Sequence, residues 1–218
     1  DGTATGNTLV GATAASAGNA VVAETNLTLT TSAGTTSAIS YAQYSTAATI
    51  ATAITTAASG IGVTATATNT TTLASLGAAG TVTFTLFGGA NSTVQGAAVS
   101  AVIADQNDLS NLVSAINGVQ GTTGISAAFT TTGSKASITL STTDGRNIGI
   151  DTFANNTAGN DTVVFGGSTL TEGAAATINA VVTGTISLSS TQGPIATANA
   201  GADVFASAGV NNSSFLSV

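Results

Sequence analysis

A helix–turn–strand pattern within Asp108–Ile150 constrains the fold of this chain more than any other feature. Its first part predicts a short helix, because apolar residues at i, i+3, i+4 and i+7 form one stripe. These stripe residues are Leu109, Leu112, Val113 and Ile116. Asn107 or Asp108 is expected to cap the start of the helix. Gly118 is expected to end it as a left-handed residue.

Two predicted strands follow this helix, one ending near Phe129 and one running from Ala136 to the turn Asp144-Gly145. This order of elements resembles the α/β motif of the variable outer region of bacterial flagellins and of hook-associated flagellar proteins. The resemblance covers Asp108–Ile150. It implies a structural module whose function lies in its surfaces rather than in an active site.

The same pattern occurs 62 positions earlier, within Thr49–Thr68. The matching pairs are Ile50 with Leu112, Ile54 with Ile116, Gly62 with Gly124, Val63 with Ile125, and Ala65 with Ala127. Chance alignment of Ala/Thr-rich sequence is the alternative. Because helix positions, a glycine and an alternating strand all match without a gap, we favour a structural repeat. Superimposable helices are therefore expected near Thr46–Ala58 and Asp108–Asn117.

Alternating apolar residues predict strands around both helices. These residues are Leu27 and Leu29, then Val82, Phe84 and Leu86, and near the C-terminus Ile178, Ala180, Val182, Ile186 and Leu188. Each helix is too short to be stable alone in water, so it must pack on a sheet. The predicted fold class is mainly β with two short helices (α+β).

Three regions are expected: two related β-rich α+β modules and a β-rich C-terminal part. The first module covers residues 1–78, with a helix near 46–58. The second covers 79–153 and contains the flagellin-like motif at 108–150. Residues 154–218 form the C-terminal segment. In flagellins the outer region is inserted between two helical segments, so the resemblance implies that this segment returns towards the N-terminus.

The composition excludes several classes of function. The chain lacks Cys, His, Met and Trp, which removes thiol nucleophiles, disulfides and the commonest general base near neutral pH. Its net charge of −7 opposes binding to nucleic acid. The uncharged stretch between Glu24 and Asp105 is rich in Thr, Ser, Gly and Ala and has no long apolar run, so no membrane interaction is expected.

Four candidate sites have simpler structural explanations. Ala158–Gly167 resembles one calcium-binding nonapeptide of a β-roll, but such sites need stacked copies, and a turn before a strand at Val163–Phe165 explains it. Asp105 and Asp108 form a candidate dyad, although carboxylates are favoured in the first turn of any helix.

The other two candidates involve the cations of the chain. The turn Asp144-Gly145 fits a tight hairpin, in which Arg146 pairs with Asp144 or Asp151. Lys135 is interpreted as a solvated turn residue rather than a nucleophile. We therefore predict no catalytic, cofactor-binding or metal-binding residues, and no enzyme.

The leading interpretation is the surface-exposed variable domain of a flagellin, an extracellular structural protein of the bacterial flagellar filament. Its roles would be motility and the outer surface of the filament, including antigenicity, adhesion and contacts with host or other cell surfaces. The alternatives are the outer domain of a hook-associated or capping flagellar protein, or a surface-layer or adhesin module. The start at Asp1 is expected for a fragment. The full-length protein would self-assemble into a filament, whereas the isolated fragment would be monomeric.

Overall fold

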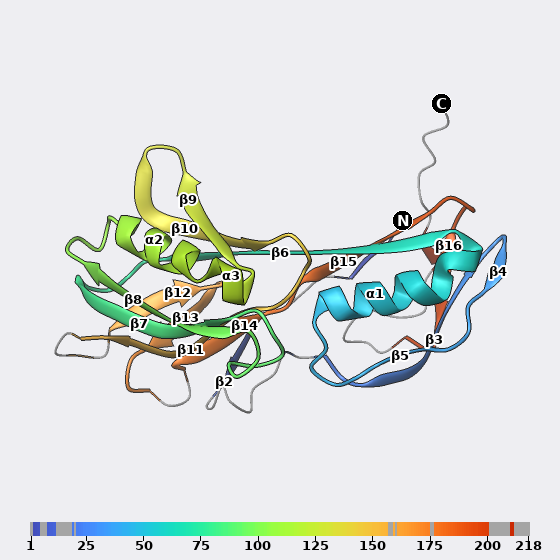
Figure 1. Ribbon diagram of the computed structural model, residues 1–218, viewed down its shortest axis with the longest axis horizontal. Helices are drawn as coiled ribbons and strands as arrows, with labels where there is room; N and C mark the ends of the chain where they lie inside the picture. Colours follow the sequence, from blue (N-terminus) through green and yellow to red (C-terminus); the bar gives the residue numbers. More distant parts are fainter. Residues whose placement is uncertain are drawn as a thin grey trace.

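The protein consists of two lobes arranged along one axis, as Figure 1 shows for the computed structural model. The structure describes residues 2–4, 8–11, 19, 21–156, 159, 161–174, 177–200 and 210–211. Each lobe contains one longer helix, so we name them the α1 lobe and the α2 lobe. Strands dominate both lobes, which confirms the predicted β-rich α+β fold class. No described helix is long and apolar enough to span a membrane.

The elements follow one another along the described chain in a simple order. The first part contains β1 (Gly2–Ala4), β2 (Thr8–Gly11), β3 (Glu24–Thr31), β4 (Gly34–Thr35), β5 (Ile39–Tyr41), α1 (Ala47–Ala58), η1 (Ser59–Ile61) and β6 (Val63–Ala74). The middle contains β7 (Gly80–Phe87), β8 (Gly96–Ile103), α2 (Ser110–Gly118), α3 (Gln120–Thr123), β9 (Ser126–Thr131), β10 (Ser134–Thr142) and β11 (Ile148–Asn155). The last part contains β12 (Thr162–Phe165), β13 (Ser168–Thr171), β14 (Asn179–Val182), β15 (Thr185–Ser190), β16 (Ile195–Ala198) and β17 (Val210–Asn211).

The strands form three antiparallel sheets. The largest has the order β1-β15-β6-β10-β9, and the hairpin β12–β13 pairs with the end of β6. A second sheet has the order β2-β14-β11-β7-β8, and the third has the order β17-β16-β3-β4 with β5 also paired to β3. Strand β6 is the longest and runs through both lobes (Figure 1). Its residues alternate between buried and exposed over nearly its whole length, so one face covers both cores.

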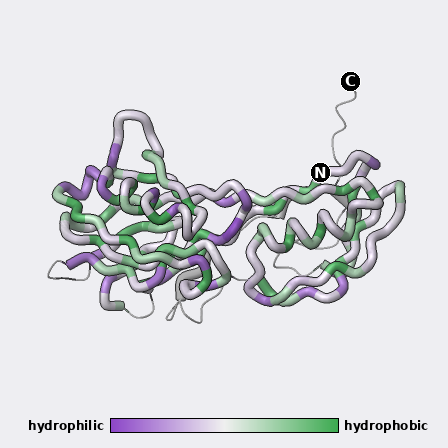
Figure 2. Tube along the Cα trace, in the orientation of Figure 1, coloured by the Kyte–Doolittle hydropathy of each residue, from purple (hydrophilic) through white to green (hydrophobic). Residues whose placement is uncertain are grey.

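Each lobe has its own hydrophobic core. In the α1 lobe, Ile50 and Ile54 of α1 pack with Leu27 and Leu29 of β3 and with Val63 of β6. The core of the α2 lobe is larger and is enclosed by α2 and two sheets. It includes Leu112 and Ile116 of α2, Phe84 and Leu86 of β7, Leu140 of β10, Ile150 of β11 and Phe165 of β12. In Figure 2 the strongly hydrophilic residues lie mainly in turns, one of them between the lobes.

Apart from β2, which precedes β3 in the chain and pairs with β14, the α2 lobe is an insertion in the chain of the α1 lobe. The chain leaves the α1 lobe along β6, builds the α2 lobe, and returns along β15, which pairs with β6 from Ser190↔Val63 to Thr185↔Thr68. Strand β16 then pairs with β3 and completes the α1 lobe. The pairing of β1 with β15 also brings residues 2–4 beside this returning segment. The sequence-predicted boundaries at 78/79 and 153/154 stay predictions.

The two lobes share one topology. Apart from the short elements β4, η1 and α3, the order of the chain in the α1 lobe is β3, β5, α1, β6, β15, β16, and in the α2 lobe it is β7, β8, α2, β9, β10, β11. The pairings correspond as well: β3 pairs with β5 and β16, as β7 pairs with β8 and β11. Likewise β6 pairs with β15 as β9 pairs with β10. The predicted repeat is therefore present in the fold.

Individual residues of the repeat also play the same parts. Gly62 and Gly124 both have left-handed backbones, with φ of 68° and 71°, and each precedes the strand after the helix. All four predicted helix positions, Ile50, Ile54, Leu112 and Ile116, are fully buried. The matched strand residues Val63, Ala65, Ile125 and Ala127 are buried too. An offset of 62 residues thus relates equivalent positions in the two lobes.

One contact of the repeat was not predicted. A polar side chain on each helix bonds both the backbone amide and the backbone carbonyl of one residue on the next strand. In the α1 lobe, Thr55 Oγ1 accepts from the Ala65 amide at 2.9 Å and donates to the Ala65 carbonyl at 3.1 Å. In the α2 lobe, Asn117 does the same to Ala127, at 2.8 Å and 3.0 Å. Both helices are therefore fixed to their strands by backbone groups that would otherwise need water.

Two local predictions were wrong. Gly118 is the last residue of α2 and is not left-handed, because the chain continues into the short helix α3 and turns at Gly124 instead. The turn Asp144-Gly145 does not join a hairpin. Strand β10 before it pairs with β6 and β9, whereas β11 after it pairs with β7 and β14. The turn therefore carries the chain from one sheet to another.

Candidate functional site

The turn between β10 and β11 lies where the two lobes meet, and it contains the shortest ion pair of the described residues. Gly145 at its centre has φ of 73°, and a Cβ there would come within 2.3 Å of the Ala67 side chain. Both the backbone conformation and the lack of space therefore require glycine. This close approach brings Asp144 and Arg146 beside the α1 lobe.

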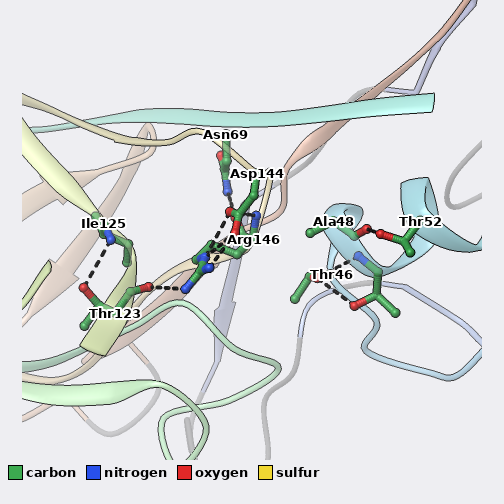
Figure 3. Close-up of polar contacts among 9 residues, drawn as sticks. Thr46, Ala48, Thr52, Asn69, Thr123, Ile125, Asp144 and Arg146 are labelled. Carbon is green, nitrogen blue, oxygen red and sulfur yellow. Dashed lines mark hydrogen bonds and ion pairs between the residues drawn. The ribbon is translucent and has the colours of Figure 1, made fainter. Parts of the chain in front are cut away.

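Arg146 ties this turn to the α2 lobe. Its Nε donates to both carboxylate oxygens of Asp144, at 3.0 Å and 2.9 Å, and its Nη1 donates to the Thr123 carbonyl at 3.2 Å (Figure 3). The hydrogen bond from Arg146 lowers the pKa of Asp144, and the same bond raises the pKa of Arg146. Arg146 thus pairs with Asp144, one of the two partners expected from the sequence.

Three buried asparagines lie near the joint between the lobes, and two of them, Asn19 and Asn147, join the lobes directly. Asn19 Nδ2 donates to the Ser45 carbonyl, just before α1, at 2.8 Å, and to Asn147 Oδ1 at 3.1 Å. Asn147 Nδ2 donates in turn to the Gly89 carbonyl at 2.9 Å. These bonds join the start of α1 to the α2 lobe through the buried side chains of Asn19 and Asn147. Separation of the lobes would break these bonds, so the bonds favour one relative orientation of the lobes.

The third asparagine fixes the turn itself. Asn69, on the buried face of β6, donates through Nδ2 to the Arg146 carbonyl at 3.0 Å and to the Val182 carbonyl at 2.8 Å. Figure 3 shows Asn69 above the Asp144–Arg146 pair, and Thr46 at the start of α1 to the right of the pair. Strand β6 therefore positions the charged turn directly.

A groove of about 460 Å³ lies between this turn and the start of α1. Its lining includes Gln43 and Tyr44 from the α1 lobe and Gln95 from the α2 lobe, together with Asp144 and Arg146. Tyr44 and Gln95 both have positive φ, 64° and 55°, although neither is glycine. Such backbone conformations in bulky residues are strained and are enriched at functional sites.

Asp105 and Asp108, the candidate dyad for which the sequence already offered a simpler explanation, accept from different partners. Asp105 accepts from the Asn107 amide at 2.9 Å, whereas Asp108 accepts from the Ser110 amide at 3.0 Å and pairs with Lys135 at 3.1 Å. The hydrogen bond from the Ser110 hydroxyl is the main cause that lowers the pKa of Asp108 to about 2. A carboxylate so acidic is ionised at neutral pH and is a poor proton donor. Asp108 instead accepts from the Ser110 amide, the first amide of α2. The N-cap position is occupied by Leu109, so the prediction that Asn107 or Asp108 caps the helix was wrong.

Lys135 lies in β10 rather than in the turn, and its partner is Asp108. The stretch Ala158–Gly167 forms strand β12 over Thr162–Phe165, as its apolar residues predicted, while residues 157, 158 and 160 lie outside the described part of the chain. Asp161 and Glu172 face each other at the end of the β12–β13 hairpin, where the Glu172 amide donates to the Asp161 carbonyl at 2.8 Å. Among the described residues, no group of three or more acidic side chains is placed to hold a metal ion.

Sequence reasoning found Asp144 and Arg146 but missed the groove and the buried asparagines. Asn19 and Asn147 are 128 residues apart, so no local pattern links them. In a chain this rich in Asn and Thr, a buried amide has no sequence signature that separates it from a surface one. The one usable signal was the Asp-Gly dipeptide, which marked a turn but not its partners.

No family model and no curated protein matches the sequence. Two similar solved structures are both of the flagellar cap protein FliD from Escherichia coli. Its D2-D3 domains are 14% identical with a TM-score of 0.29, over 86% of this chain and 99% of that chain. Its D1-D2-D3 domains are 12% identical with a TM-score of 0.23, over 77% of this chain and 56% of that chain. At these TM-scores we draw no functional conclusion from the likeness.

Proposed function

We propose that this chain is a surface-exposed outer module of a bacterial flagellar filament protein, most specifically a flagellin. The observation that carries the proposal is the helix–strand unit of the α2 lobe, whose sequence over Asp108–Ile150 resembles the flagellin and hook-associated motif. In the structure, the apolar stripe of that motif is the inner face of α2, and its two strands are β9 and β10. The motif thus builds a sheet-backed module.

The proposed role is structural. Both helices bury their apolar stripes against sheets of their own lobe, so neither has an apolar face free for a coiled coil. Filament growth in the family that the motif resembles depends on terminal helices of that kind. In this proposal, other parts of the full-length protein assemble the filament, and the two lobes form its outer surface, where antigenicity and adhesion are determined.

Immunogold electron microscopy with antibodies raised against this chain tests the proposal. We expect labelling along the whole length of the flagellar filament. Labelling restricted to the filament tip or to the hook junction would instead identify a capping or hook-associated protein. Labelling of the cell wall with bare flagella would refute the flagellar role and favour a surface-layer or adhesin module.

The isolated chain is proposed to be a monomer. The chain has nine acidic residues and only two cations, which gives a net charge of −7. Copies of the chain therefore repel one another. Light scattering coupled to size exclusion is expected to give a mass near 20.6 kDa. Filaments formed by the isolated chain would contradict the outer-module interpretation, because assembly would then not need other segments.

A further inference from the structure

The groove between the lobes has the chemistry of a binding site, although nothing in the proposed structural role requires one. Tyr44 and Val94 line it and are among the few exposed large hydrophobic residues of the described chain. Around them lie the side-chain amides of Gln43 and Gln95 and the Asp144–Arg146 pair. We propose that this groove binds a neutral oligosaccharide.

The polar groups of the groove retain hydrogen-bonding capacity. A guanidinium has five N–H donors, and Arg146 uses its Nε, one Nη1 and one Nη2 hydrogen on Asp144 and Thr123. One hydrogen on each Nη therefore stays available to a ligand. Asp144 adds acceptor lone pairs, and each glutamine amide both donates and accepts. Donors and acceptors side by side suit the adjacent hydroxyls of a sugar, which also do both.

The exposed aromatic ring supports the same ligand class. Tyr44 is 38% exposed, and its ring offers an apolar face with a polar tip. The apolar C–H face of a sugar ring can stack on such a surface while its hydroxyls reach the surrounding amides. Tyr44 holds this position at φ of 64°, a conformation that glycine would adopt without strain.

Other ligand classes fit less well. An anionic ligand meets the carboxylate of Asp144 and a protein of net charge −7. A metal ion lacks the required cluster of acidic ligands among the described residues. A purely apolar ligand would leave the amides and the ion pair without partners as it displaced their water. A neutral polyhydroxylated ligand avoids all three penalties.

The shape of the surface favours a chain of sugars over a single one. A second cavity of about 550 Å³ runs along α1, between Thr52 and Thr55 on the helix and Thr66 on β6. It shares Ala48 and Asp144 with the groove, so the two form one continuous surface around the start of α1. Thr66 and the acceptor lone pairs of Thr52 extend the polar lining beyond the groove, whereas the Thr55 hydroxyl is already bonded to Ala65.

Rigidity of the joint supports binding at this place. The two sides of the groove belong to different lobes, and the Asn19–Asn147 bonds fix their separation. Because the site is already formed, a ligand does not have to order it on binding. The groove is open to solvent, so a bound oligosaccharide would stay partly hydrated. We therefore expect a dissociation constant of ~1 mM for one oligosaccharide.

An NMR titration of the whole chain with hexasaccharides tests the proposal. The neutral probes are chitohexaose, maltohexaose, mannohexaose and xylohexaose, and the anionic probe is hexagalacturonate. We expect at least one neutral probe to shift the amide resonances of Tyr44, Gln95 and Arg146 in a saturable way. Hexagalacturonate should bind at least about tenfold more weakly. The absence of any saturable shift up to ~10 mM of every neutral probe overturns the proposal.

Variants at the positive-φ positions separate loss of binding from loss of fold. Tyr44→Gly and Gln95→Gly remove the side chains but suit the existing backbone, so their melting temperatures should stay near that of the parent chain. Tyr44→Gly should weaken binding about tenfold or more, whereas Tyr44→Phe, which keeps the ring, should retain it. The matched control is Phe129→Ala, because Phe129 is also 38% exposed but lies on β9. Equal affinities of Tyr44→Gly and Phe129→Ala would overturn the proposal.

Discussion

Replacement of Thr55 by valine tests whether the helix-to-strand clamp holds α1 in place. Valine has nearly the shape of threonine but lacks the hydroxyl that bonds both backbone groups of Ala65. Each such bond contributes a net ~0.5–1.5 kcal/mol to folding. Thr55 is only partly buried, so water can replace part of the loss. We therefore expect Thr55→Val to lower the free energy of unfolding by about 1–2 kcal/mol.

Thr56→Val is the matched control on the same helix. Thr56 is exposed, and its hydroxyl donates only to the Thr52 carbonyl one turn earlier, at 2.8 Å. The Thr52 carbonyl lies inside the helix, where a backbone amide also bonds to it, and the Thr56 hydroxyl can bond to water instead. Loss of this side-chain bond should therefore lower the free energy of unfolding by less than ~0.5 kcal/mol. Threonine and valine also have similar helix propensities, which removes propensity as an explanation for any difference.

Urea unfolding followed by circular dichroism gives the free energies, and hydrogen exchange locates the effect. In Thr55→Val the amide of Ala65 should exchange faster, because its hydrogen-bond acceptor is gone. The amides of the α2 lobe should keep their protection. Equal free energies of unfolding for Thr55→Val and Thr56→Val, with an unchanged exchange rate at Ala65, would refute the role of the clamp.

Three further predictions concern the α2 lobe. Asn117→Ala should lower the free energy of unfolding by about 1–2 kcal/mol, because it removes both bonds to buried Ala127. Asn111→Ala, at a likewise exposed position of the same helix, removes only one bond, to the Val102 carbonyl, and should have a smaller effect in the same urea assay. Gly124→Ala should destabilise the protein by at least ~1 kcal/mol, because φ is 71° there and the new Cβ would lie 2.3 Å from Arg146 Nη1. Gly118→Ala, at a helical position with open space around it, should stabilise the protein by about 0.5–1 kcal/mol. Thermal melts of the two variants test both expectations. Ser110→Ala should raise the pKa of Asp108 from about 2 towards ~3.9 in an NMR titration. Because the folded-state pKa of Asp108 is depressed, its contribution to stability is present above about pH 4 and is lost as the pH falls through about 2, and Ser110→Ala should shrink that window.

The sequence was sufficient to predict those parts of the fold that depend on local periodicity. The helix expected near Thr46–Ala58 is α1, with Thr46 as its cap through a 3.2 Å bond from the Thr49 amide. The repeat was visible because buried positions of equivalent helices must stay apolar and the left-handed turn must stay glycine. These constraints act within about 20 residues of one another, a range in which a pattern can be recognised.

Features that depend on distant pairing were not predictable in this way. The Asp144-Gly145 dipeptide signals a turn, but the same turn chemistry serves a hairpin and a crossing between sheets. Which of the two occurs is decided by β6 and β7, which lie far away in the sequence and take β10 and β11 as separate partners. The groove depends on the same long-range arrangement, because its two sides come from different lobes.

The shared topology also identifies where this architecture can grow. The α2 lobe occupies the connection between β6 and β15, and the equivalent connection in the α2 lobe is the tight turn between β9 and β10. Gly133 in that turn has open space around it, and the hairpin projects away from the rest of the molecule (Figure 1). A third copy placed there would nest inside the second as the second nests inside the first. This topology therefore allows further lobes to be inserted one at a time, each into the β9–β10 type of turn of the previous lobe, without changing the strand pairing of the lobes already present.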